Sequence, residues 1–411
     1  MPRNLTQTDA HAIMTELVKQ ATGRNNFAVV DTSSFVSAGE QLMASGYENV
    51  MNAISLLIGR TLIAARPYSG KLNIINSINT GVYSHRIRKI SYYSRDPEAS
   101  GDWNTQLYTN LADGYDNGTN SANSTPNMWE QHQAIPVEFN FAGSDVWQFP
   151  ITIYVDQLKQ AFRDESSFNA FWAGVMTEHE NDVESQKEAF RRMTLLNFIG
   201  GVANLGTAGV NFINLTSGFN TAFGTSYTTA QLLSGQYRQF YEYFISEVRK
   251  ASDRMTDRTK NYHWSPTRTD GNVILRHTPK DRQRMIVYGP MFTDAEARVF
   301  PEIFNPNYIK EEYTEKVNFW QSSLTPATVN VRPAIPVSNG AQTAGTAFNP
   351  DQMVAVLYDE DAMMVDFQLE SALATPVEAR KRYYNIWLSM AKNSLTDFTE
   401  NGIVLYMDDT P

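Results

Sequence analysis

The longest regular pattern in the sequence is a helical one near the middle of the chain. Across residues 166–201 apolar and aromatic residues recur at the spacing of one helix face, while charged residues occupy the other face. The recurring set is Phe168, Phe171, Trp172, Val175, Met176, His179, Val183, Phe190, Leu196 and Ile199. Ser166 or Ser167 is a suitable N-cap and Gly200–Gly201 a suitable stop. The pattern predicts one helix of about thirty-four residues, ~50 Å long.

A long excursion precedes this helix. Residues 82–93 and 135–141 alternate between apolar and polar positions, which predicts two strands, each exposed on one side. Between them, residues 113–127 read DGYDNGTNSANSTPN and offer almost no apolar area to bury. We therefore interpret residues 71–145 as an extended hairpin-like loop with a polar tip. Long loops without a core of their own are usually functional.

Shorter patterns fill the rest of the chain. Residues 1–46 hold only short apolar patches, so we expect an arm that becomes ordered on assembly. Helical spacing predicts helices at 47–58, 229–257 and 294–304. Apolar runs predict strands at 284–288, 328–332 and 354–357, and at further positions within 353–411. Gly, Asn and Thr predict loops at 216–229 and 338–350.

Composition narrows the class of protein. The 411 residues contain no cysteine, which excludes disulfides, thiolate metal sites and cysteine nucleophiles. Charged residues make up 19%, below the usual ~25%, and aromatic residues 12%, which favours surfaces buried against other subunits. The formal net charge of −10 argues against tight, sequence-independent binding of nucleic acid. The N-terminus lacks the apolar core of a secretory signal, and the apolar run 54–65 is too short for a bilayer. We therefore expect synthesis in the cytoplasm and no membrane partner.

Catalytic motifs do not emerge. His179-Glu180 lacks the second histidine four residues on that a zinc protease needs. The sequence contains no phosphate-binding GxxxxGK[ST] loop and no GxSxG nucleophile elbow. The triplet Asp359-Glu360-Asp361 follows an apolar strand, a place where carboxylates can be catalytic. An enzyme with an acidic site there stays open as an alternative, although no partner motif accompanies the triplet and a turn after a strand is the favoured interpretation.

Charge divides the excursion into two parts. Basic residues gather on its outgoing strand, whereas nine acids and no Lys or Arg occur from Asp96 to Asp156. The long helix adds acids of its own, so the basic root could dock onto the acidic surface of a neighbouring copy. The candidate contact residues are Arg86, Arg88, Lys89, Arg95, Trp103, Glu180, Asp182 and Glu184.

The order of these segments resembles that of a known family, the major capsid proteins of tailed bacteriophages. SFNAFWAGVMTEHENDVESQKEAFRRMTLLNFIGG (166–201) resembles the spine helix of their Hong Kong phage capsid fold. ILRHTPKDRQRMIVYGPMFTDAEARVFPEIFN (274–305) is similar to the strand and helix of the axial domain. VAVLYDEDAMMVDFQLESALATPVEARKRYYNIW (354–387) resembles the closing section of coat proteins from small podophages of Gram-positive hosts.

The resemblance implies an α+β chain with the parts of that fold. These would be an N-terminal arm at 1–46, the start of a peripheral domain at 47–70, an E-loop at 71–145, the peripheral domain with its spine helix at 146–204, an axial domain at 205–352, and closing strands of both domains at 353–411.

The resemblance also implies a function, that of a coat protein rather than an enzyme. Such a chain self-assembles through hexamers and pentamers into an icosahedral head around double-stranded DNA, without cofactor, catalytic residue or bound metal. Because no long N-terminal scaffolding segment is present, a separate scaffolding protein is implied, together with a portal. An encapsulin, a cellular compartment of the same fold that stores cargo enzymes, is the alternative.

Overall fold

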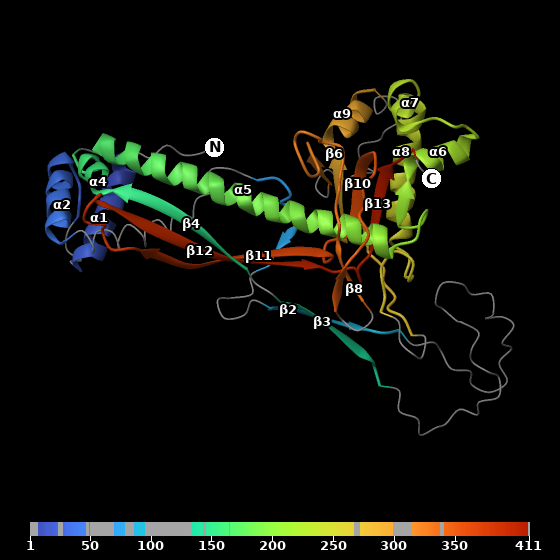
Figure 1. Ribbon diagram of the computed structural model, residues 1–411, viewed down its shortest axis with the longest axis horizontal. Helices are drawn as coiled ribbons and strands as arrows, with labels where there is room; N and C mark the ends of the chain where they lie inside the picture. Colours follow the sequence, from blue (N-terminus) through green and yellow to red (C-terminus); the bar gives the residue numbers. More distant parts are fainter. Residues whose placement is uncertain are drawn as a thin grey trace.

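A computed structural model describes residues 7–23, 28–46, 49, 70–78, 86–94, 133–142, 145–163, 165–266, 272–298, 314–337 and 341–409 of the 411-residue chain. One long helix, α5 (Glu165–Leu205), links two groups of elements (Figure 1). The helices α1 (Gln7–Thr22), α2 (Thr32–Ala44) and α4 (Val155–Ala161) lie at its N-terminal end. A five-stranded sheet with its own helices lies at its C-terminal end.

The predicted long helix is confirmed, but it is longer than the pattern indicated. It has 41 residues, which corresponds to ~60 Å. It continues through Gly200 and Gly201, the residues that were expected to end it. These glycines serve close packing instead: a Cβ at Gly201 would overlap the Phe398 ring, and one at Gly200 would lie 3.0 Å from Val331.

A four-stranded sheet lies along α5. Its strand order is β1–β11–β12–β4, with β1 at Asn76–Ser77, β4 at Asp145–Tyr154, β11 at Met363–Ala374 and β12 at Tyr383–Thr396. Alternate residues of β4 and β12 are buried on the side that faces the helices, as the period of a strand requires. The side chains of Ile151, Ile153, Ile386 and Leu388 belong to that core.

The N-terminal residues form part of the same core. Ala10, Met14 and Leu17 of α1 and Phe35 and Leu42 of α2 are fully buried beside the four-stranded sheet. Asp31 begins α2 with a capping box, accepting the backbone N–H of Ser34. The expectation of an arm that orders only on assembly is therefore wrong for residues 7–22 and 32–44. Each short apolar patch stabilises a helix because tertiary contacts bury it.

The second sheet has the order β5–β13–β10–β6–β7. Its strands are β5 (Phe212–Asn214), β6 (Gln283–Tyr288), β7 (Thr314–Val317), β10 (Gln352–Asp359) and β13 (Gly402–Met407). One face is covered by the helices α6 (Leu215–Phe223), α7 (Thr229–Ser234), α8 (Tyr237–Arg254) and α9 (Gly289–Arg298). The other face packs against the C-terminal half of α5. The short strands β8 (Ala334–Pro336) and β9 (Gln342–Ala344) form a separate pair.

Several local predictions need correction. The loop expected at 216–229 contains α6, which Asn214 caps, and the single helix expected at 229–257 is two helices separated at Gly235. Residues 328–332 form only one isolated bridge, Val331 to Phe348, whereas strand β9 lies inside the expected linker 338–350. The strands expected at 284–288 and 354–357 are confirmed as β6 and β10. The helix expected at 47–58 and the tip 113–127 lie outside the described residues, apart from Asn49.

Candidate functional site at the root of the excursion

The excursion leaves the body of the protein as a two-stranded antiparallel ribbon, which confirms the two alternating segments. The strands are β2 (Arg86–Tyr92) and β3 (Pro136–Ala142), and Arg88 lies opposite Asn140. The ribbon lies on the side of the four-stranded sheet away from α5 (Figure 1). Ile87 and Ser91 are buried toward the body, while Ile90 and Tyr92 are 49% and 58% exposed. One face of the ribbon is therefore seated and the other is open.

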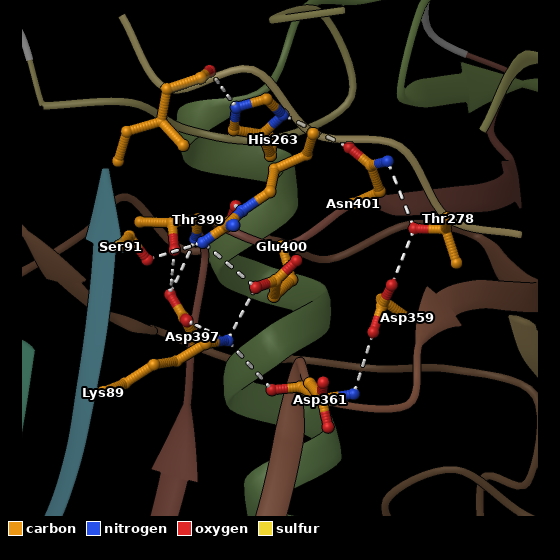
Figure 2. Close-up of polar contacts among 12 residues, drawn as sticks. Lys89, Ser91, His263, Thr278, Asp359, Asp361, Asp397, Thr399, Glu400 and Asn401 are labelled. Atoms are coloured by element: carbon orange, nitrogen blue, oxygen red, sulfur yellow. Dashed lines mark hydrogen bonds and ion pairs between the residues drawn. The ribbon is translucent and has the colours of Figure 1, made fainter. Parts of the chain in front are cut away.

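Lys89 anchors the seated face in a buried ion cluster (Figure 2). Its Nζ lies 2.6 Å from Oδ2 of Asp397 and 2.7 Å from Oε1 of Glu400. Both carboxylates belong to the turn between β12 and β13, the 397–401 turn. Asp397 is 2% and Glu400 9% exposed, so their attraction to the ammonium is weakly screened by water.

Arg276 ties a third segment to the same turn. Its Nη2 lies 3.2 Å from Oε1 of Glu400 and donates to the Ser91 hydroxyl at 2.6 Å. Its Nε donates to the carbonyl oxygen of Thr399 at 3.1 Å. Beyond β2, the Ser94 N–H donates to the Val273 carbonyl at 3.0 Å. The ribbon, the segment 272–278 and the 397–401 turn are thus held together by charge-assisted bonds.

The cluster also shifts proton affinities. Burial by itself lowers the pKa of Lys89, but the Asp397 and Glu400 carboxylates outweigh burial and hold this pKa above its ordinary value. Burial raises the pKa of Glu400, against the opposing effect of Lys89 and Arg276. The two carboxylates therefore favour the charged form of Lys89, whereas burial favours the neutral form of Glu400.

A chain of hydrogen bonds continues from this turn to the acidic triplet. His263 donates from Nε2 to the Ile274 carbonyl at 2.7 Å, and its Nδ1 lies 3.2 Å from Oδ1 of Asn401. Asn401 donates to the Thr278 hydroxyl at 3.2 Å, and that hydroxyl donates to Oδ2 of Asp359 at 2.8 Å. Burial lowers the pKa of His263. These contacts, also drawn in Figure 2, fix the end of β10 against the root.

The remaining acids of the triplet are engaged in ion pairs. Glu360 pairs with Arg282 at 2.8 Å and also with Arg284, while Asp361 pairs with Arg282 at 2.6 Å. Within the described part of the chain, no group of three His, Asp or Glu side chains could hold a metal ion. The triplet thus closes a turn and binds two arginines, which favours the structural interpretation over the catalytic one.

The structure places the predicted contact residues on the ribbon and on α5 in different environments. Lys89 faces its own chain, so it does not contribute to an outward basic surface; Arg88 is exposed and pairs across the ribbon with Glu138 at 2.6 Å. On α5, Glu180 is buried, and burial raises its pKa to about 7, whereas Asp182 is exposed.

Glu184, also on α5, lies 3.9 Å from Lys187 and 3.7 Å from Arg191 of the same helix. For Arg86 the structure gives only its place at the start of β2, opposite Ala142, and Arg95 and Trp103 lie outside the described residues.

Sequence reasoning missed the partners of Lys89. Asp397, Glu400 and Arg276 are far from the excursion in sequence and belong to no motif. The one available signal was the polar run TDFTENG after an apolar strand, which marks a turn but not a binding partner.

Comparison with known proteins identifies the family. Residues 96–406, most of the chain, match the family model of the Phi29-like phage major capsid protein. No curated protein matches the chain. The capsid structure of Staphylococcus phage Andhra has a TM-score of 0.51 and 9% identity, covering 82% of this chain and 84% of that one. A chain from the structure of head fiber and inner core protein gp22 of native bacteriophage P68 has a TM-score of 0.52 at the same identity and coverage.

These structures share the fold of this chain. No helix among the described residues combines the length and the apolar character needed to cross a bilayer. The chain belongs to the Phi29-like phage major capsid protein family, and it is a coat protein that assembles into the head shell of a bacteriophage.

Proposed function

We propose that the excursion, the part of residues 71–145 that leaves the four-stranded sheet through β2 and β3, reaches over an adjacent subunit of the shell, and that residues 205–352 form the centres of its hexamers and pentamers. The observation that supports this is the asymmetry of the ribbon. Lys89 fixes one face to its own subunit, while Arg88, Ile90 and Tyr92 on the other face are exposed. A fixed root gives the excursion a defined direction, which a repeated contact between identical subunits requires.

The proposal extends to the contents and partners of the shell. The head would enclose double-stranded DNA, and a separate scaffolding protein and a portal would take part in assembly in the host cytoplasm. With a net charge of −10, the chain would enclose DNA without tight or sequence-specific binding. Arg86, Arg88, Arg95, Trp103 and Asp182 remain proposed contact residues between subunits.

Removal of residues 113–127 tests the proposal. The deletion removes polar residues that have little apolar area to bury, so the subunit should stay folded and soluble. We expect far fewer closed shells than with the full chain, measured by size-exclusion chromatography and negative-stain electron microscopy. Shells of normal number and shape would contradict the proposal.

The alternatives make different predictions. The family match favours a virus head over an encapsulin, and particles purified from infected cells should contain nuclease-protected DNA and no cargo enzyme. For the acidic triplet, replacement of Asp359, Glu360 and Asp361 by alanine should impair folding or assembly, because it breaks the pairs with Arg282 and Arg284. Loss of a catalytic turnover in a folded, assembling variant would favour the enzyme.

A further inference from the structure

The end of the protein farthest from the second sheet carries a compact basic surface. The turn between β11 and β12 contains Arg380, Lys381 and Arg382, all exposed, and we call these three residues the basic tip. The tip lies beside the start of α4, because the Val155 N–H donates to the Arg382 carbonyl at 2.9 Å. A further cationic residue, Arg163, is exposed just after the end of α4.

Hydrogen bonds hold the backbone of the basic tip, and the Glu378 carboxylate accepts the Lys381 backbone N–H within the same turn. The Glu378 N–H donates to Tyr383 and the Arg382 N–H to Glu378, each at 2.8 Å. The backbone of Arg382 has a φ of 57°, a conformation that usually favours glycine. The Arg382 Nη2 atom lies 3.2 Å from Oδ1 of Asp156 and forms an ion pair with it. Among the described residues, no carboxylate forms an ion pair with Arg380 or Lys381.

An apolar row adjoins the basic tip on the open face of the four-stranded sheet. Leu373, Trp387 and Pro150 lie side by side on three neighbouring strands. Leu373 is 66% and Trp387 37% exposed. Aromatic and arginine side chains around an apolar centre are the composition of protein interfaces rather than of ordinary surface.

Two tips cannot meet each other, because like charges would face one another. The chain supplies a complementary surface in residues 96–130, which contain six acids and no Lys or Arg; we call this segment the acidic stretch. It also contains apolar and aromatic residues such as Trp103 and Leu107. The ends of β2 and β3 from which it emerges point away from the basic tip of the same subunit (Figure 1). This direction favours a tip on another copy.

We propose that the basic tip, together with Leu373 and Trp387, binds the acidic stretch of a second copy of this chain. The inference rests on the proposed reach of the excursion and reverses the charge scheme drawn from the sequence. In that scheme the basic root was the docking element; here Lys89 of that root is neutralised inside its own subunit, and the excursion also contributes carboxylates to the contact.

Charge reversal tests this contact. Arg380→Glu with Lys381→Glu should fold normally, since neither side chain has a described ion partner, but the yield of shells should fall more than about tenfold. Glu98→Lys with Asp102→Lys should show a similar defect alone and should restore assembly when combined with the reversed tip. The matched control is Arg258→Glu with Lys260→Glu, two exposed residues beyond α8, which should assemble like the natural chain.

A cross-link gives a direct reading, because the chain has no cysteine of its own. Lys381→Cys with Asp113→Cys should form disulfide-linked multimers in assembled shells, whereas Lys260→Cys with Asp113→Cys should not. Normal shells from the reversed tip, a loss of packaged DNA alone, or equal defects in the control would each overturn the proposal. If deletion of 113–127 prevents assembly while the reversed tip does not, this contact is wrong and the proposed reach of the excursion stands.

Discussion

The ammonium of Lys89 lies 2.6 Å from a carboxylate oxygen of Asp397 in the interior of the protein, and this pair joins the root of the excursion to the turn after β12. Lys89 is followed by the acidic stretch, whereas Asp397 lies between the last strands of the two sheets. The direction of the excursion is therefore coupled to the junction of both sheets.

Replacement of Lys89 by methionine tests that coupling. The variant removes the cation of the buried Asp397 carboxylate and leaves Glu400 with Arg276 alone, which should cost about 3–5 kcal/mol of unfolding free energy. Arg88→Met is the matched control, since its pair with Glu138 is exposed and should contribute less than about 1 kcal/mol. Thermal unfolding and hydrogen exchange of the ribbon would measure both. Equal effects of the two substitutions would show that the cluster has no special role.

Glu180 offers a test of burial on α5. Burial raises its pKa to about 7, so the folded protein pays a penalty for the charged form above pH 7. The penalty falls as the pH is lowered through 7 toward the ordinary value of 4.5, because the folded state then binds the proton first. Glu180→Gln should raise the melting temperature at pH 8 and have little effect near pH 4.5. Asp182→Asn, an exposed neighbour, should change little at either pH.

His263, beside the 397–401 turn, should have the opposite effect to Glu180: it should make the folded protein less stable as the pH is lowered. Burial lowers the pKa of its imidazole below the ordinary 6.5, so below pH 6.5 the unfolded chain binds a proton that the folded chain does not. Stability should fall as the pH drops below 6.5, and His263→Gln should weaken that dependence. His277→Gln, at an exposed position, should leave it unchanged. Melting temperatures from pH 7.5 to 5.5 would decide; identical slopes for all three proteins would exclude the role.

The close approach of α5 to the turn after β12 predicts a strong glycine requirement. A Cβ at Gly201 would overlap the ring of Phe398, which stacks on Phe198 with centroids 6.0 Å apart. Gly201→Ala should therefore destabilise the subunit by at least about 1–3 kcal/mol. At Gly235 the nearest atom to a Cβ would be 3.7 Å away, so Gly235→Ala should be tolerated. Chemical denaturation of both variants would show whether the ring can move aside at low cost.

The sequence by itself determined the long helix, the two strands of the ribbon, β6 and β10, and the resemblance to phage coat proteins. These features follow from periodicity, which depends only on residues close together in the chain. It could not determine the packing of residues 7–22 and 32–44, because their short apolar patches become helices only where a sheet and α5 bury them. The helix end was misplaced at Gly200–Gly201 for a similar reason. These glycines allow close packing against Phe398 and Val331, which are distant in sequence, and do not end the helix.

Only the tertiary structure determined which charged side chains form ion pairs within the subunit and which remain exposed. The sequence indicated a basic root and an acidic outer part but could not assign partners, because an ion pair depends on distance in space. Folding brings Asp397, Glu400 and Arg276 to Lys89, which converts the expected docking residue into a buried anchor. It also leaves Arg380 and Lys381 exposed at the far end of the sheet, a position that no local pattern of residues predicted.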